Sequence, residues 1–324
     1  MRISQLQSRG GIIDMADETS FNFWDKTMSQ LKGELNIILD IIPQGSKVIY
    51  VDYPVYYNIG DLLIMLGTAK FFQENNISLL NKFNVHNFPS NYNIPENVII
   101  VCQGGGNFGD IWETHQNFRN KLMDQFSNTP IVILPQSIYF GKESNAKLVR
   151  NIFEGHRNNF VFVRERDSEA QLLKWLPNTQ YSVCPDMAHM LWPGLYKGNN
   201  LGRNRLGLLR SDKEKSVSTT NISSMMDWEE IISQEDNEFA LSIISKIGNE
   251  ENVYQQWLEH AVKIVNRAIN TFSDSSEIVT DRLHGHLLSC LMGIPNVFLP
   301  NAYHKNKSYY DTWTKPLANT VKFV

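Results

Sequence analysis

Two side chains suited to anion binding and proton transfer stand close together near the C-terminal end of the chain, in the segment Thr280-Asp-Arg-Leu-His-Gly-His286. Arg282 and His284 are two positions apart, so in extended chain ahead of a helix they can point the same way. A guanidinium binds phosphate or carboxylate through a fork of N–H donors, and an imidazole exchanges protons near neutral pH. The pair therefore predicts a site for an anionic substrate, with His284 as general acid or base. The alternative is a His284 that only packs at the start of a helix.

Other charged side chains follow apolar runs elsewhere in the sequence. Arg164 opens the segment Arg164-Glu-Arg-Asp167, and Arg210 ends the run Arg205-Leu-Gly-Leu-Leu-Arg210. Because an arginine is costly to bury without an anion, each either binds the same ligand or pairs with neighbouring acids. Asp186, in Cys184-Pro-Asp-Met-Ala-His189, is a candidate carboxylate of the same cleft.

A glycine-rich segment, Gln103-Gly-Gly-Gly-Asn-Phe-Gly-Asp110, follows another apolar run. Gly105, Gly106 and Asn107 could let the backbone approach an anion or a sugar hydroxyl closely. The segment has neither the lysine of a phosphate-binding Walker loop nor the GxGxxG spacing of dinucleotide sites, so a turn with no ligand is the alternative. Earlier, Asn58 and Asp61 flank Gly60 and could bind a ligand or cap a helix.

These segments must be positioned by strands and helices that the residue pattern predicts. Continuous apolar runs typical of buried parallel strands alternate with stretches of helical periodicity. In the first half, the expected strands are 47–52, 97–102, 130–135 and 159–164, and the expected helices are 20–42, 61–72, 112–126, 142–153 and 167–175. In the second half, the expected strands are 205–210, 277–281 and 295–300, and the expected helices are 252–272 and 283–292.

The alternation predicts an α/β fold of two Rossmann-like domains that face each other across a cleft. Proline, glycine and asparagine crowd between residues 185 and 205, which we interpret as a linker, and the polar stretch 211–226 as a loop. The expected domains are residues 1–195 and 196–324. Ligands in such sheets bind beyond the carboxyl ends of the strands, where the segments above lie.

Composition excludes several classes of protein. The 324 residues are 42% hydrophobic and 20% charged, with a formal net charge of −4, which is typical of a globular protein and not of a general nucleic-acid binder. The three cysteines cannot form a disulfide framework, and the histidines have no HxxxH spacing, so we expect no metal site. No apolar run has the length of a membrane span. A cytoplasmic protein fits best.

Taken in order, the motifs resemble those of the polysaccharide pyruvyl transferase family from about residue 48 to residue 300. They are Asn58-Ile-Gly-Asp61, the GGGN turn, Arg164-Glu-x-x-Ser168, Pro185-Asp-x-Ala188, Leu209-Arg-x-Asp-x-Glu214 and Asp281-Arg-Leu-His-Gly285. Arg-Leu-His-Gly carries most of the resemblance. Residues 1–47 and the loop 211–230 match nothing in that pattern.

The resemblance implies a glycosyltransferase-B-like fold and an enzyme that moves the pyruvyl group of phosphoenolpyruvate onto a sugar as a cyclic ketal, releasing phosphate. Arg282 and His284 occupy the family's essential Arg-Leu-His positions, Asp186 or Asp61 would assist, and no cofactor or metal is needed. The second domain would bind the donor and the first the acceptor. The implied donor contacts are Arg282, His284, Arg164, Arg210 and Leu283, and the implied acceptor contacts are Asn58, Asp61, Gly105, Gly106 and Asn107.

The sequence does not identify the acceptor sugar, its carrier or the oligomeric state. A lipid-linked acceptor would bring the protein to the inner face of the membrane, and Phe21, Phe23 and Trp24 beside Lys26 could form an interfacial helix face. A helix that faces the core is the alternative. Two other functions are compatible with the architecture: a glycosyltransferase that uses nucleotide sugars, and a non-catalytic sugar-binding relative.

Overall fold

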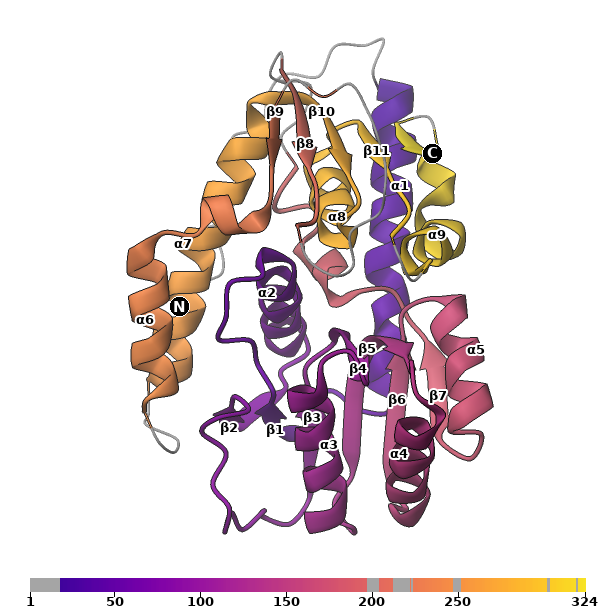
Figure 1. Ribbon diagram of the computed structural model, residues 1–324, viewed down its shortest axis with the longest axis vertical. Coiled ribbons are helices and arrows are strands. Elements are labelled where there is room, and N and C mark those ends of the chain that lie inside the picture. Colours follow the sequence, from indigo (N-terminus) through magenta and orange to yellow (C-terminus); the bar gives the residue numbers. More distant parts are fainter. Residues whose placement is uncertain are drawn as a thin grey trace.

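The computed structural model contains two separate parallel β-sheets with helices packed around them (Figure 1). It describes residues 18–196, 204–211, 222, 224–246, 252–301, 304–318 and 320–324. All strands of the first sheet come from residues 47–183 and all strands of the second from residues 204–323. The chain is therefore an α/β protein with parallel sheets, as the sequence predicts.

The first sheet has the strand order β2-β1-β3-β5-β6-β7, with β4 paired to β5. Apolar runs such as Val98–Cys102 and Asn159–Val163 form its interior because helices cover both of its faces. Its strands are β1 (Lys47–Val51), β2 (Ser78–Phe83), β3 (Val98–Cys102), β4 (Gly105–Gly109), β5 (Ile131–Tyr139), β6 (Asn159–Val163) and β7 (Gln180–Val183). Its helices are α2 (Ile59–Glu74), α3 (Glu113–Gln125), α4 (Glu143–Gly155) and α5 (Arg166–Trp175).

The second sheet has the strand order β12-β11-β10-β8-β9. Its strands are β8 (Asn204–Leu208), β9 (Ser224–Met226), β10 (Ser275–Thr280), β11 (Asn296–Phe298) and β12 (Val321–Phe323). Its helices are α6 (Gln234–Ile244), α7 (Val253–Ser273), α8 (Leu283–Met292) and α9 (Lys305–Tyr309). Helix α7 is strongly amphipathic and places Trp257, Ile264 and Val265 in the core.

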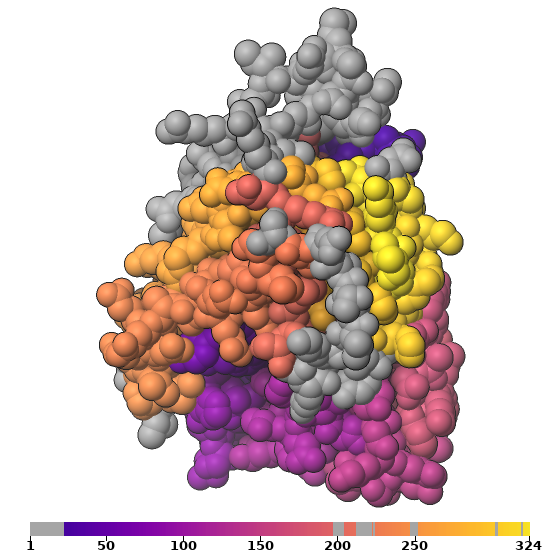
Figure 2. All heavy atoms as spheres, turned by 45° about the horizontal axis from the view of Figure 1, so that its top comes forward, coloured from indigo at the N-terminus to yellow at the C-terminus, as the bar shows by residue number. Residues whose placement is uncertain are grey.

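The two units share one hydrophobic core, and α2 lies between the sheets (Figure 1). Gly67 of α2 approaches the carbonyl oxygen of Met187 so closely that a Cβ would lie 2.0 Å from it. From the second unit, Trp257 Nε1 donates to the carbonyl oxygen of Pro54, over 2.5 Å. In the space-filling view, the orange atoms of α6 and α7 reach the indigo and purple atoms of the first unit (Figure 2).

Helix α1 (Glu18–Glu34) comes before the first strand in sequence but contacts the second unit. Trp24 Nε1 donates to the carbonyl oxygen of Cys290 in α8, over 3.1 Å. Trp24 is 7% exposed, whereas its neighbour Phe23 is 46% exposed. The tryptophan thus faces the core, which favours the core-facing alternative over a membrane face for Trp24. The division of the chain into domains at residue 195 stays a prediction, and residues 197–203 lie outside the described part.

Most predicted strands and helices are confirmed, with ends displaced by at most four residues, but four details were wrong. The helix expected over 20–42 ends at Glu34 and continues as a 3-10 turn, Leu35–Asp40. The glycine-rich segment is not a simple turn, because Gly105–Gly109 pairs with β5 as β4. The described part of the 185–205 linker contains a buried 3-10 turn, Met187–Leu191. Within the expected loop 211–226, Ser224–Met226 forms β9, and residues 212–221 and 223 lie outside the described part.

Several edge strands were missed, namely β2, β7 and β12. Their exposed or half-buried residues lack the continuous apolar character of the central strands. Among the described residues, no helix combines the length and apolar character required to cross a bilayer.

Candidate active site

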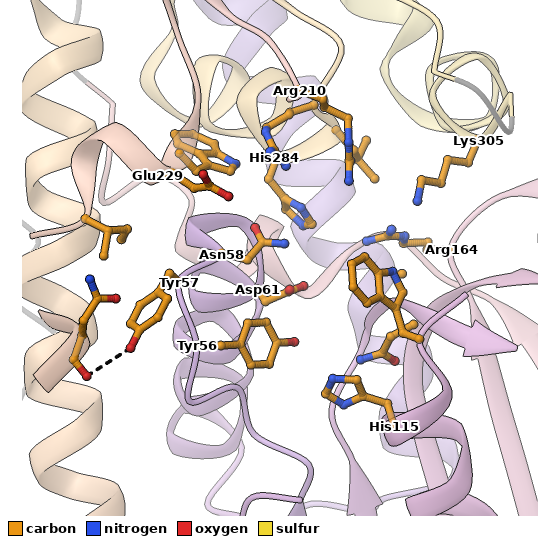
Figure 3. A pocket seen from close by; sticks show the side chains of 18 residues that line it. Tyr56, Tyr57, Asn58, Asp61, His115, Arg164, Arg210, Glu229, His284 and Lys305 are labelled. Carbon is orange, nitrogen blue, oxygen red and sulfur yellow. Dashed lines mark hydrogen bonds between the residues drawn. The ribbon is translucent and has the colours of Figure 1, made fainter. Parts of the chain in front are cut away.

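A pocket of about 640 Å³ opens between the two units, at the carboxyl ends of their strands (Figure 3). The first unit contributes the start of α2, the glycine-rich segment and the end of β6, and the second contributes the segments after β8 and β10 and the start of α9. Its lining is Tyr56, Tyr57, Asn58, Asp61, Gly106, Asn107, Trp112, His115, Arg164, Arg210, Trp228, Glu229, Ile232, Asn237, Arg282, Leu283, His284 and Lys305.

The imidazole of His284 lies against the start of α2. A Cβ placed on Gly60 would lie 2.5 Å from His284 Nδ1 and 2.9 Å from its Cβ, so only glycine fits beneath the ring. Asn58 caps α2 by accepting a hydrogen bond from the Gly60 amide, over 3.0 Å. The Asn58-Ile-Gly-Asp61 motif thus forms a helix start shaped to receive a side chain from the other unit.

Asp186 lies behind His284, away from the pocket. Its Oδ2 is 3.3 Å from His284 Nε2 and 2.7 Å from Arg164 Nη1, and the carboxylate is fully buried. Burial by itself raises the pKa of Asp186, but its contacts with His284 and Arg164 lower the pKa more, so it lies well below the ordinary value. Asp186 is therefore a carboxylate that holds His284, and the expectation that it lines the cleft was wrong because both its oxygens are engaged from within.

Arg164 is 2% exposed and is held by three groups of the first unit. Its Nε donates to Ser137 Oγ over 2.8 Å and lies 3.6 Å from Glu165, while Nη1 donates to Asp186. Glu165 in turn accepts hydrogen bonds from Ser137 and Ser168, which explains the Arg-Glu-x-x-Ser pattern. The alternative in which Arg164 pairs with neighbouring acids is confirmed. Arg164 also lines the pocket, and its contact with a ligand stays a prediction.

Arg282 lies at the cap of α8 and forms a forked ion pair with Asp227 of the second unit. Its Nη2 is 2.5 Å from Asp227 Oδ2, and its Nε donates to the other carboxylate oxygen. The pKa of Asp227 falls below its ordinary value because these contacts and two backbone amides outweigh the effect of burial. The expectation of a fork that is open to a ligand needs correction, since two of its three nitrogens face Asp227. Arg210, Leu283 and Arg282 all line the pocket.

Most, but not all, of the predicted acceptor residues line the pocket. Asp61, Gly106 and Asn107 line the pocket, whereas Gly105 lies behind them and lines none of it. Burial raises the pKa of Asp61, against the opposing charges of His284, His115 and Arg164. Asn107 Oδ1 accepts from Arg119 Nη1 over 2.9 Å, so this amide is fixed by the fully buried Arg119.

Several residues that line the pocket were not predicted from the sequence. His115 Nδ1 lies 2.6 Å from Asp52 Oδ1, and its ring meets Tyr56 edge to face. Asp52 directly follows β1 and has φ +64°, a conformation rare for a residue other than glycine. The other lining residues that were not predicted are Tyr56, Tyr57, Trp112, Trp228, Glu229, Ile232, Asn237 and Lys305. No motif marks them, and only folding brings them to one place.

The fold and the site define an α/β protein with a pocket between two parallel sheets, rich in cationic side chains and holding an imidazole against a buried carboxylate. Such a pocket suits an anionic substrate and a transfer that needs proton exchange. The chain belongs to the polysaccharide pyruvyl transferase family, whose sequence profile matches residues 58–303. The resemblance seen in the motifs is thereby confirmed.

Two relatives support this assignment. The chain is 37% identical over 302 residues to "Putative pyruvyl transferase EpsO" of Bacillus subtilis, covering 91% of this chain and 94% of that protein. It is 22% identical over 295 residues to "Pyruvyl transferase 1" of Schizosaccharomyces pombe, covering 82% and 69%. A crystal structure of an uncharacterized Klebsiella pneumoniae protein has the same fold, with a TM-score of 0.64, 20% identity and coverage of 91% and 98%.

We expect Asp227→Ala to lower the free energy of unfolding by about 3–5 kcal/mol, because it removes the carboxylate that forms a forked ion pair with the largely buried Arg282. Asp311→Ala is the matched control. Asp311 pairs with Lys307 on the surface, with 41% of its side chain exposed, and its loss should cost about 0–1 kcal/mol. Urea unfolding of both variants measures the difference, and equal losses would contradict a structural pair at Arg282.

Proposed function

We propose that the protein transfers the pyruvyl group of phosphoenolpyruvate to a sugar of a cell-surface polysaccharide or its lipid-linked precursor, forms a cyclic ketal across two hydroxyls and releases phosphate. The observation that carries the proposal is the His284 imidazole, held by Asp186 in a pocket that Arg164, Arg210 and Arg282 also line. The family and its pyruvyl transferase relatives support it.

The donor carries a phosphate and a carboxylate, which arginine side chains bind by charge-assisted hydrogen bonds. In the proposed reaction, the methylene carbon of the donor accepts a proton, and a sugar hydroxyl attacks C2 while it gives up its own proton to a base, so this addition is balanced. A second hydroxyl then attacks the same carbon, the C2–O bond to phosphate breaks, and the ring closes. Phosphate leaves with the electron pair of that bond, and the proton of the second hydroxyl balances it.

His284 is the candidate that gives or accepts protons in these steps. Asp186, a carboxylate throughout the neutral range, fixes the orientation of the ring. Asp61 is a second candidate, since burial raises its pKa and brings its proton exchange nearer to neutral pH. Developing positive charge at C2 would be stabilised by carboxylates near the pocket.

On the acceptor side, the pocket offers aromatic rings and amides that suit a sugar. Tyr56, Tyr57 and Trp112 line it together with Asn58 and Asn107. Aromatic faces cover the apolar face of a pyranose, and amides bond its hydroxyls. The proposal places the reaction in the cytoplasm, at the inner face of the membrane when the acceptor is lipid-linked. It requires no metal or organic cofactor.

The decisive experiment incubates the purified protein with phosphoenolpyruvate and a panel of acceptor glycans. Mass spectrometry detects the pyruvyl increment on the glycan, and a phosphate assay follows release. Pyruvylation with stoichiometric phosphate supports the proposal. Transfer of a glycosyl group from nucleotide sugars, or sugar binding without phosphate release, would replace it with one of the two alternatives.

For His284, we expect His284→Ala to lower turnover by roughly 10²–10⁴, the usual contribution of a general acid–base. His284→Gln should do little better, because an amide hydrogen-bonds but does not shuttle protons. Donor affinity should fall much less, since the arginines remain. If Gln restored turnover and Ala lowered only the melting temperature, His284 would be a packing residue.

Gly60→Ala tests whether the position of the imidazole matters. The new methyl group would overlap His284 and displace the ring, so turnover should fall by about 10²-fold, a typical cost of misplacing a catalytic group by about 1 Å. Gly33→Ala in α1 is the matched control, because a Cβ there meets no atom within 4 Å. Turnover and melting temperature are measured for both. Wild-type turnover in Gly60→Ala would mean that the close approach has no catalytic consequence.

A further inference from the structure

We propose that Tyr309 is a positioning residue of the transferase and acts through Asp186. Its hydroxyl, held by His189, fixes the backbone of Asp186 and thereby keeps the carboxylate on the imidazole of His284. The inference rests on the proposed function for the reaction whose rate is affected, and on the geometry for the positioning itself. Tyr309 and His189 do not line the pocket, so both act through other residues.

The contacts of Tyr309 join the two units behind the pocket. Tyr309 ends α9 of the second unit, yet its hydroxyl accepts a hydrogen bond from the amide of Asp186 in the first unit, over 3.1 Å. The same hydroxyl lies 3.0 Å from His189 Nε2, and the planes of the two rings meet at 6°. Tyr309 and His189 are 0% and 1% exposed, so bulk water cannot take over these bonds.

The donors and acceptors at this point give His189 a defined role. Burial lowers the pKa of His189 to about 4, so its ring is neutral near neutral pH and one ring nitrogen can accept a hydrogen bond. The Tyr309 oxygen already accepts from the Asp186 amide, and its proton needs an acceptor of its own. Nδ1 has no partner among the described residues in either tautomer, so Nε2 decides. Tyr309 therefore donates to Nε2, and the imidazole sets the direction of the hydroxyl.

Fixing the backbone of Asp186 also fixes its carboxylate, because the side chain is short and both of its oxygens are engaged. Oδ1 accepts from the Ala188 amide over 2.9 Å, and Oδ2 lies 3.3 Å from His284 Nε2. A separation of 3.3 Å is already long for a charge-assisted hydrogen bond, whose usual length is about 2.7–2.9 Å. A small further displacement of the backbone would therefore break the contact and release the imidazole.

The segment that carries Tyr309 is also anchored beside His284. Thr314 ends the π-helical turn Tyr310–Thr314, which follows α9 directly. Its Oγ1 lies 2.9 Å from Nε2 of the fully buried His286, which stands two positions after His284 in α8. One short segment thus contacts the helix of the imidazole at one end and the backbone of its carboxylate partner at the other.

Two further hydrogen bonds hold this segment against the first unit. Ser308 Oγ accepts from the amide of Asp167 over 3.0 Å, and Trp313 Nε1 donates to the carbonyl oxygen of Arg164 over 2.8 Å. Figure 1 shows α9 above α5, and the two helices are in contact. These bonds do not involve the tyrosine hydroxyl, so its removal should cause a local shift and no separation of the units.

The test compares Tyr309→Phe with Tyr254→Phe by steady-state kinetics with phosphoenolpyruvate and an acceptor glycan. Tyr309→Phe keeps the ring and removes the hydroxyl, so kcat should fall about 3–10-fold, the rate equivalent of one neutral hydrogen bond. KM for the donor should stay near the wild-type value, because Arg164 keeps its hydrogen bond to Ser137. Tyr254→Phe should retain the wild-type kcat, since this buried hydroxyl has no hydrogen-bond partner within the described residues.

Two variants of His189 test the same hydrogen bond from its other side. His189→Gln can still accept from the Tyr309 hydroxyl, whereas His189→Leu cannot. Turnover should fall in His189→Leu as far as in Tyr309→Phe, and His189→Gln should recover part of the loss. Equal turnover in the two variants would overturn the role of His189.

The imidazole of His284 provides a readout that does not depend on activity. In protein labelled with nitrogen-15 at histidine, the ring signals of His284 are identified by their absence from the spectrum of His284→Gln. Tyr309→Phe should shift these signals because the contact with Asp186 weakens, and Tyr254→Phe should leave them in place. A role limited to stability would lower the melting temperature of Tyr309→Phe without moving the signals or changing kcat, and this outcome would overturn the proposal.

Shifted His284 signals and a lower kcat at constant KM in Tyr309→Phe would support the positioning role. Unchanged signals together with a wild-type kcat would overturn it while leaving pyruvyl transfer intact. Shifted signals in Tyr309→Phe, combined with no pyruvyl transfer by the wild type, would support the positioning of His284 and contradict the proposed function.

Discussion

The site depends on the contact between the imidazole of His284 and the first turn of α2. This contact joins the two units: the ring belongs to α8 of the second unit, and Gly60 and Asp186 belong to the first. Because no Cβ fits at Gly60, the two helix starts approach more closely than side chains would otherwise allow. The pocket forms around this contact, with α2 as its base and both sheets directing their strand ends toward it.

Three buried arginines in and around the pocket each form an ion pair with a buried or largely buried aspartate. Asp186 holds Arg164, Asp227 holds Arg282, and Asp52 holds Arg119. These pairs offset the large desolvation cost of a buried charge and fix the geometry of long side chains. Preorganised side chains can then act on a ligand without the cost of reorganisation at the moment of reaction.

The family motifs acquire separate physical meanings in this arrangement. Asn58 caps helix α2, and Gly60 leaves room for the imidazole ring of His284. Asp61 lines the pocket. In the Arg-Glu-x-x-Ser segment, the arginine lines the pocket while the serine and glutamate support it. Asp281 accepts a hydrogen bond from the Arg210 amide and so ties the end of β10 to the end of β8. A motif here combines a ligand-facing residue with the residues that hold it.

The sequence by itself determined the α/β class, the central strands and the helices that follow them, because continuous apolar runs and helical periodicity are local signals. It also determined the family, because the motifs and their order along the chain can be read directly from the sequence. Local patterns could not determine edge strands such as β2, whose residues are only half buried, nor the partner of a charge. Asp227 for Arg282, Asp52 for His115 and Tyr309 for Asp186 are all distant in sequence. Only the tertiary structure decided these, since a pocket between two sheets is assembled from strand ends that the chain itself keeps far apart.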